Sequence, residues 1–80
     1  MAEIKVYATL NDPWCEELKK WLKKKKFSFE LLDLDESDNA RDELIQKSHQ
    51  LAIPMIDING EIIVGFFPEK IEAAILKSES

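Results

Sequence analysis

Cys15 is the only thiol in the chain, and it follows the segment Asn11-Asp12-Pro13-Trp14, where a predicted strand gives way to a helix. Asp12 supplies an acceptor side chain before the helix, and Pro13 suits the first helical position. The thiol then lies one turn inside the helix N-terminus, where unpaired N–H groups and the helix dipole favour negative charge. Such an environment lowers a cysteine pKa and favours the thiolate, which is the nucleophilic form.

The composition limits what kind of protein this chain can be. A chain of 80 residues is long enough for one domain, which we expect to span residues 1–80. A composition with 45% hydrophobic and 34% charged residues is typical of a soluble globular protein. A formal net charge of −5 argues against a general affinity for nucleic acid or for an anionic membrane. No apolar run is long enough to span a bilayer, and the charged, alternating N-terminus predicts no signal peptide.

The cysteine count adds two exclusions. One cysteine cannot form an internal disulfide or a zinc cluster made from cysteines of this chain, and we expect no metal site. A small chain without disulfides suits a reducing compartment, so we expect a cytoplasmic protein.

Hydrophobic periodicity predicts the elements that position the strand-to-helix junction. Alternation predicts strands over residues 3–9 and 27–33, and helical spacing predicts a helix over about 13–25. Ser37 or Asp38 can cap a second helix that reaches to about Gln50. The predicted buried face of the first strand consists of Ile4, Val6 and Ala8, opposite Lys5, Tyr7 and Thr9.

The second half of the chain carries the strongest local signals. Asn59-Gly60 between the runs 56–58 and 61–64 predicts a β-hairpin. Pro54 suits the first position of the strand before it, because a proline has no N–H for a central ladder position. Pro68 opens a third helix, whose buried face is predicted to consist of Ile71, Ala74 and Ile75.

The predicted element order is β-α-β-α-β-β-α. A strand–helix–strand unit is parallel with a right-handed crossover, and the later hairpin adds antiparallel neighbours. We therefore predict an α/β fold with a four-stranded mixed sheet and helices on both faces.

Six segments of the chain have the residue types of one known family, in the same order and with the same spacing. They are Val6-Tyr7-Ala8-Thr9, Asp12-Pro13-Trp14-Cys15, Ile53-Pro54, Ile58-Asn59-Gly60-Glu61, Val64-Gly65-Phe66 and Pro68-Glu69-Lys70. On these segments the chain resembles a glutaredoxin-like protein of the thioredoxin-fold superfamily. The resemblance runs from about Ile4 to Leu76, and it is to the small bacterial glutaredoxins and the glutaredoxin-like electron donors of ribonucleotide reductase. It implies the minimal thioredoxin fold and a role in electron transfer or redox homeostasis.

The resemblance also implies roles for individual residues. The active site of the family is a C-P-[YW]-C turn, and Pro13, Trp14 and Cys15 match its last three positions, so Cys15 corresponds to the resolving thiol. Pro54 corresponds to the cis proline beside the active site. The preceding residue, Ile53, corresponds to the one whose main chain pairs with glutathione or a substrate peptide. Gly65 corresponds to a glycine on the far side of the same groove, and Trp14 would flank the site.

Asp12 stands where the resemblance places the attacking cysteine. A carboxylate cannot form the mixed disulfide of thiol–disulfide exchange, so the two-cysteine mechanism is impossible in this chain. Asp12 can act as a plain helix N-cap, and it can also mimic the charge of a thiolate or polarise Cys15. Burial and the negative Asp12 would raise the pKa of Cys15, against the effect of the helix N-terminus. Whether Asp12 is natural or engineered stays open.

Three further features have a structural and a functional interpretation. Phe67 replaces the aspartate that often caps the last helix in relatives. The two rings of Phe66 and Phe67 either pack against that helix or leave an exposed apolar edge that could contact a partner. The acidic segment 33–36 is interpreted as loop and cap rather than as a cation site, and the lysine run 23–26 as a solvated helix end. His49 is predicted to face solvent.

Two functions follow. The first is a glutaredoxin-like thiol–disulfide oxidoreductase with a degenerate Asp-Pro-Trp-Cys active site, weak or inactive, in which Cys15 and Asp12 are the catalytic candidates. The second is a non-catalytic thioredoxin-fold module that binds glutathione or an extended peptide in the cis-proline groove. We expect no tightly bound cofactor, glutathione as cosubstrate, a protein thiol or disulfide as partner, and a monomer.

Overall fold

A computed structural model describes residues 3–9, 11–50 and 52–79. The element order is β1 (Ile4–Ala8), α1 (Pro13–Lys24), β2 (Glu30–Asp33), α2 (Asp38–Ser48), β3 (Met55–Ile58), β4 (Glu61–Val64) and α3 (Pro68–Glu79). The predicted order β-α-β-α-β-β-α is thereby confirmed.

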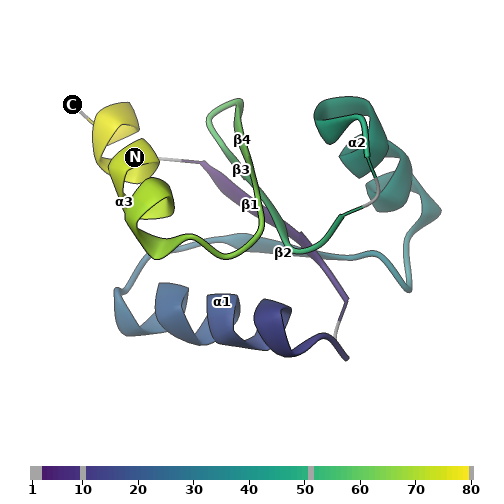
Figure 1. Cartoon of the computed structure of the whole chain (residues 1–80), viewed down its shortest axis with the longest axis horizontal. Coiled ribbons are helices and arrows are strands. Elements are labelled where there is room, and N and C mark those ends of the chain that lie inside the picture. The colour runs from purple at the N-terminus through teal and green to yellow at the C-terminus, as the bar shows by residue number, and fades with distance from the viewer. Residues whose placement is uncertain (1–2, 10, 51, 80) are drawn as a thin grey trace.

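The four strands form one mixed sheet in the order β2-β1-β3-β4. β1 runs parallel to β2 and antiparallel to β3, and β4 returns antiparallel beside β3. The β3–β4 hairpin lies between α3 and α2 in Figure 1, and its two-residue turn is formed by Asn59 and Gly60, both at positive φ. A turn of this type matches the right-handed twist of the two strands, which is why the Asn-Gly pair predicts it so well.

Helices cover both faces of the sheet, as predicted. α1 and α3 share one core cluster with the sheet, and α2 packs on the opposite face. The first cluster contains Ile4, Val6, Ala8, Cys15, Leu18, Leu22, Ile56, Ile58, Ile63, Ile71, Ala74 and Ile75. The second contains Tyr7, Leu34, Ala40, Leu44 and Met55.

Tyr7 corrects the prediction of a first strand with a single buried face. Its side chain is fully buried on the face opposite Val6, in contact with the α2 cluster. Alternation with polar neighbours does not distinguish an exposed tyrosine from one whose hydroxyl is hydrogen-bonded under a helix. The strand is also shorter than predicted, since β1 ends at Ala8.

The second strand begins later than predicted, at Glu30, because the chain first closes α1 with a turn through residues 25–27. Lys26 has a φ of 63°, and the N–H of Phe27 donates to the carbonyl of Leu22 at 3.0 Å. This left-handed closure satisfies carbonyls of the last helical turn. The alternating phenylalanines are partly buried and pack against the first core cluster. The second helix likewise ends early, at Ser48, with His49 as its left-handed C-cap.

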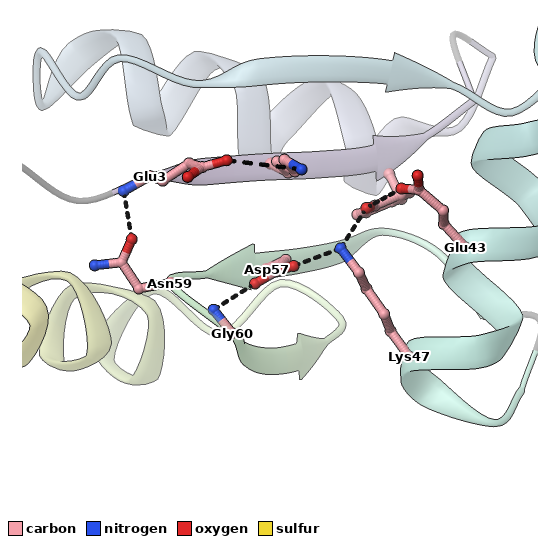
Figure 2. A network of polar contacts seen from close by, with 8 residues as sticks. Glu3, Glu43, Lys47, Asp57, Asn59 and Gly60 are labelled. Carbon is pink, nitrogen blue, oxygen red and sulfur yellow. Dashed lines mark hydrogen bonds and ion pairs between the residues drawn. The ribbon is translucent and has the colours of Figure 1, made fainter.

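A polar network crosses the α2 face of the sheet (Figure 2). The Lys47 ammonium donates to Asp57 Oδ2 at 2.6 Å and to the Tyr7 hydroxyl at 2.7 Å. The Tyr7 hydroxyl in turn donates to Glu43 Oε2 at 2.7 Å, and Asp57 Oδ1 accepts the N–H of Gly60 at 2.7 Å. The network therefore ties α2, β1 and the hairpin turn together, and two of its members, Tyr7 and Asp57, are buried.

The start of β1 is held to the same turn. Glu3 donates its N–H to Asn59 Oδ1 at 2.7 Å, and its carbonyl accepts the N–H of Asn59 at 3.0 Å, as Figure 2 shows for the first of these bonds. Together with the Lys47 network, these bonds fix the register of three strands. No helix among the described residues is long and apolar enough to cross a membrane.

We predict that Lys47→Met lowers the free energy of unfolding by about 1–3 kcal/mol, because it leaves the Asp57 carboxylate without its charged donor. Burial lowers the pKa of Lys47, but the bonds to Asp57 and Tyr7 outweigh it and raise that pKa above its ordinary 10.5. Burial also raises the pKa of Tyr7 above 10.0. A raised pKa stabilises the fold below the ordinary value, and this stabilisation is lost as the pH rises through the folded value.

Urea unfolding followed by circular dichroism at pH 7 and about pH 11 checks both parts of this prediction. The difference between the wild type and Lys47→Met should shrink at the higher pH. Lys24→Met, at the exposed end of α1, is the matched control. An equal cost for the two variants at neutral pH would contradict the role given to the network.

Candidate functional site

Asp12 caps the first helix with its side chain. Its backbone is extended, with φ −89° and ψ 125°, and its Oδ1 accepts the N–H of Trp14 at 2.8 Å and of Cys15 at 3.2 Å. Its carbonyl accepts the N–H of Glu16 at 3.1 Å, which begins the helical ladder. The predicted N-cap is therefore confirmed, and it places a negative charge at the positive end of the α1 dipole.

Cys15 points into the core rather than toward solvent. Its side chain is 1% exposed and belongs to the same buried cluster as Leu18 and Ile56. Burial raises the pKa of the Cys15 thiol, a hydrogen bond with the main chain of Thr9 lowers it, and the charge of Asp12 raises it again. The net direction is upward, so burial and Asp12 outweigh the Thr9 hydrogen bond and the charge of Lys19, which lower the pKa.

The Ile53–Pro54 peptide bond is cis, and it lies directly before β3. Pro54 is fully buried, and its carbonyl accepts the N–H of Gly65 at 2.7 Å. Ile53 is partly buried and packs against both core clusters, including the one that holds Cys15. The structure therefore brings Pro54 and Gly65 into direct contact and places Ile53 against the cluster that contains the thiol.

Gly65 occupies a position that few other residues could take. Its φ is 99°, in the left-handed region, and a Cβ there would lie 2.8 Å from Cε2 of Phe67. Glycine is required both for the backbone conformation and for the close approach of the Phe67 ring.

The aromatic residues next to Gly65 and at the capped end of α1 divide into packed and exposed ones. Phe66 is partly buried, with its ring 6.3 Å from that of Trp21 in an edge-on arrangement. Phe67 is 49% exposed, and Trp14 is 62% exposed beside the capped helix end. Two interpretations of Phe66 and Phe67 were possible from the sequence: packing in the core, or an exposed apolar edge. The structure shows that Phe66 is packed and that Phe67 is exposed. Trp14 does not pack into the core, so its ring is open to contact.

A cavity of about 450 Å³ opens at the carboxyl ends of β1 and β2, with Ile53 in its lining. Arg41 is the cationic side chain that lines it, and its Nη2 donates to the carbonyl of Leu34 at 3.1 Å. Carboxyl ends of strands at a crossover are common ligand positions in α/β folds. Arg41 was not predicted as a site residue, although its place in the first turn of α2, after the parallel strand pair, was a usable signal in the sequence. The cavity is lined by Thr9, Leu34, Asp35, Arg41 and Ile53.

His49 lies apart from these groups. It is exposed at the end of α2, with a φ of 61°, and the prediction that it faces solvent is confirmed. No group of three or more His, Cys, Asp or Glu side chains within the described parts of the chain is arranged to hold a metal ion.

Comparison with known proteins assigns this architecture to a family. Residues 4–63 match the glutaredoxin family model. The chain belongs to the glutaredoxin family. An uncharacterised glutaredoxin-like 8.6 kDa protein of the rubredoxin operon of Clostridium pasteurianum is 38% identical over 74 residues, covering 92% of this chain and 99% of that protein. Glutaredoxin 3 of Escherichia coli K12 is 32% identical over 65 residues, covering 81% and 78%.

A solved structure shows the same fold. The thioredoxin-like protein BC3987 superposes with a TM-score of 0.84 at 29% identity, covering 90% of this chain and 99% of that one. The matched glutaredoxin segment 4–63 includes Asp12, Cys15 and the cis proline, but it ends before Gly65 and Phe67. The minimal thioredoxin fold predicted from the sequence is therefore confirmed.

We predict that Asp12→Ala lowers the free energy of unfolding by about 1 kcal/mol, because two N–H groups of the first turn of α1 lose their acceptor. Asp12→Asn keeps an acceptor oxygen and should cost only a fraction of that amount. Urea unfolding followed by tryptophan fluorescence measures both variants against Glu17→Ala, which removes an exposed carboxylate of the same helix. An Asp12→Ala protein as stable as the wild type would show that the cap contributes nothing.

Proposed function

We propose that this glutaredoxin-family chain is a thiol–disulfide protein of weak or absent redox turnover that binds glutathione or an extended thiol peptide. The binding groove is formed by Ile53, Pro54 and Gly65 and is flanked by Trp14. The observation that carries the proposal is the arrangement at the start of α1, where the only thiol is 1% exposed and a carboxylate holds the helix cap.

The chemistry of exchange explains why turnover should be weak. A thiolate must attack one disulfide sulfur, displace the other as a thiolate and leave a mixed disulfide. Asp12 has no sulfur and cannot form that bond. Cys15 has one, but its burial and raised pKa oppose both approach to the substrate and formation of the thiolate.

The groove retains features that suit an extended ligand. Among the described residues, the main chain of Ile53 has no hydrogen-bond partner, so it is free to pair with an added strand. The Trp14 ring offers an exposed apolar flank, and Arg41 lines the neighbouring cavity as a donor for a carboxylate. Glutathione is an extended peptide with two carboxylates, and it would act as cosubstrate or ligand without any tightly bound cofactor.

Every residue of this groove comes from one chain, so a single copy is a complete functional unit. Cys15 is the only cysteine, and a reducing cytoplasm would keep it as a free thiol. Capture of a protein thiol or disulfide segment in the same groove is the related role with a larger partner.

We predict that Asp12→Cys creates glutathione-dependent reduction of hydroxyethyl disulfide, whereas the wild type shows little or none. The substituted thiol would sit at the exposed helix N-terminus that favours the thiolate, and Cys15 would then resolve the mixed disulfide. Coupled consumption of NADPH with glutathione reductase measures the rate. Asp12→Ser is the matched control, because it keeps a cap without a sulfur.

The outcomes separate chemistry from binding. Robust wild-type turnover that Cys15→Ser abolishes would contradict the inactive site. Glutathione titrated into the wild type in a calorimeter should release or absorb heat, with amide chemical shifts moving at Ile53 and Gly65. If neither heat nor shifts appear, the binding half of the proposal fails even if Asp12→Cys is active.

A further inference from the structure

The hairpin turn between β3 and β4 places an asparagine directly before a glycine. Asn59 and Gly60 are both exposed to solvent and both lie at positive φ. Because glycine has no Cβ, its main-chain nitrogen can approach the side-chain amide of the preceding asparagine with little hindrance. The other two asparagines of the chain precede Asp12 and Ala40, whose side chains hinder that approach. Asn59 is therefore the asparagine whose sequence context most favours cyclisation.

The chemistry open to this pair is deamidation. The Gly60 nitrogen loses its proton to a base in solvent and bonds to Cγ of Asn59, and the side-chain nitrogen leaves as ammonia. The cyclic succinimide that results then adds one water molecule. Opening at Cγ gives aspartate, whereas opening at the main-chain carbonyl gives isoaspartate. The reaction needs only water as co-reactant, and no electron changes hands.

Two hydrogen bonds hold the reacting groups toward different partners, as Figure 2 shows. The N–H of Gly60 donates to Asp57 Oδ1 at 2.7 Å, and Asn59 Oδ1 accepts the N–H of Glu3 at 2.7 Å. For cyclisation, the Gly60 nitrogen has to give up its proton and the Asn59 side chain has to fold over its own peptide bond. Both hydrogen bonds oppose these changes. The negative charge of Asp57 also disfavours a second negative charge on the Gly60 nitrogen.

The protecting carboxylate is itself held in place. Asp57 is 8% exposed, and its second oxygen accepts a hydrogen bond from the Lys47 ammonium at 2.6 Å. Water nevertheless has access to the turn, because a cavity of about 140 Å³ opens there. Its lining includes Asp57, Asn59 and Gly60. The turn thus has the reactive pair and the water, and the hydrogen bonds are what oppose the reaction.

We propose that Asn59 is a site of spontaneous deamidation, and that the hydrogen bond from Gly60 to Asp57 holds the reaction back while the hairpin is closed. Local opening of the turn then sets the rate. Isoaspartate at this position adds one carbon to the main chain of a turn that the pair Ile58–Glu61 closes around two residues. The product therefore cannot restore the original turn, and a transient opening becomes a permanent weakening of the hairpin.

Mass spectrometry of the tryptic peptide 48–70 tests the proposal, because Asn59 is the only asparagine in that peptide. The folded wild type should deamidate at least about tenfold more slowly than the same chain in urea, since only opened molecules react. Asp57→Ala should raise the rate of the folded protein about tenfold, because the Gly60 N–H loses a charged acceptor. A wild type that deamidates equally fast with and without urea would overturn the proposal.

Lys47→Met is the matched control. It breaks the same ion pair as Asp57→Ala but keeps the carboxylate that accepts the Gly60 N–H, so it should accelerate deamidation much less. Its tryptic peptide, 42–70, also contains a single asparagine. Equal acceleration in the two variants would assign the effect to lost stability, and slower deamidation in Asp57→Ala would show that Asp57 acts as a base. Either result contradicts the proposal. If Asp57→Ala does not fold, Asp57→Ser, which keeps a neutral acceptor, should still deamidate faster than the wild type.

Discussion

The N–H groups of the first turn of α1 are satisfied by the Asp12 carboxylate, and the character of the site depends on this interaction. Hydrogen bonds from Trp14 and Cys15 to one oxygen fix the backbone where the strand turns into the helix. They also place a full negative charge at the end of the helix dipole that would otherwise stabilise a thiolate. Burial raises the pKa of the neighbouring Cys15 thiol, and this charge raises it further.

The direction in which Cys15 points is a second consequence of the same turn. Once Asp12 caps the helix, the residue three positions later falls on the face that packs against the sheet, beside Leu18 and Ile56. The fold therefore gives its only thiol a structural position in the core. The exposed surface at the same helix end is left to Trp14, which can contact a ligand but cannot exchange a disulfide.

The cis-proline segment and the α2 face of the sheet are each stabilised by hydrogen bonds of their own. The cis Ile53–Pro54 segment is tied to Gly65 by one main-chain hydrogen bond on the α1 and α3 side. The network of Lys47, Asp57 and Tyr7 lies under α2 on the other side. The two sets share β3, since Asp57 belongs to that strand and Pro54 precedes it. Ile53 packs against the core clusters on both faces, so a change there would also affect the contacts that hold α2.

Local signals in the sequence were sufficient for most of the fold. The Asn59-Gly60 hairpin, the Asp12 cap and the proline at the start of α3 are each set by a few adjacent residues, and all three are found as predicted. The predictions failed where the burial of a residue depends on packing against elements that are distant in the sequence. The hydroxyl of Tyr7 is satisfied by α2, which no pattern within β1 reveals, and the alternation from Phe27 reflects rings that pack on α1.

The candidate site divides in the same way. Asp12 and Cys15 could be identified because they are close in sequence, and the cis proline and Gly65 through the resemblance of their segments to glutaredoxins. Arg41 was missed because its relation to Ile53 exists only in the folded chain. The pKa of Cys15 also depends on how deeply the thiol is buried. The sequence indicates that burial raises this pKa, but it does not show how complete the burial is.

The most direct test of the central claim is the titration of Cys15 followed by NMR through its Cβ chemical shift. The thiol should titrate above its ordinary value of 9.0, and Asp12→Asn should lower the midpoint because one negative charge is removed. A midpoint below that ordinary value in the wild type, or one that does not move in Asp12→Asn, would contradict the account.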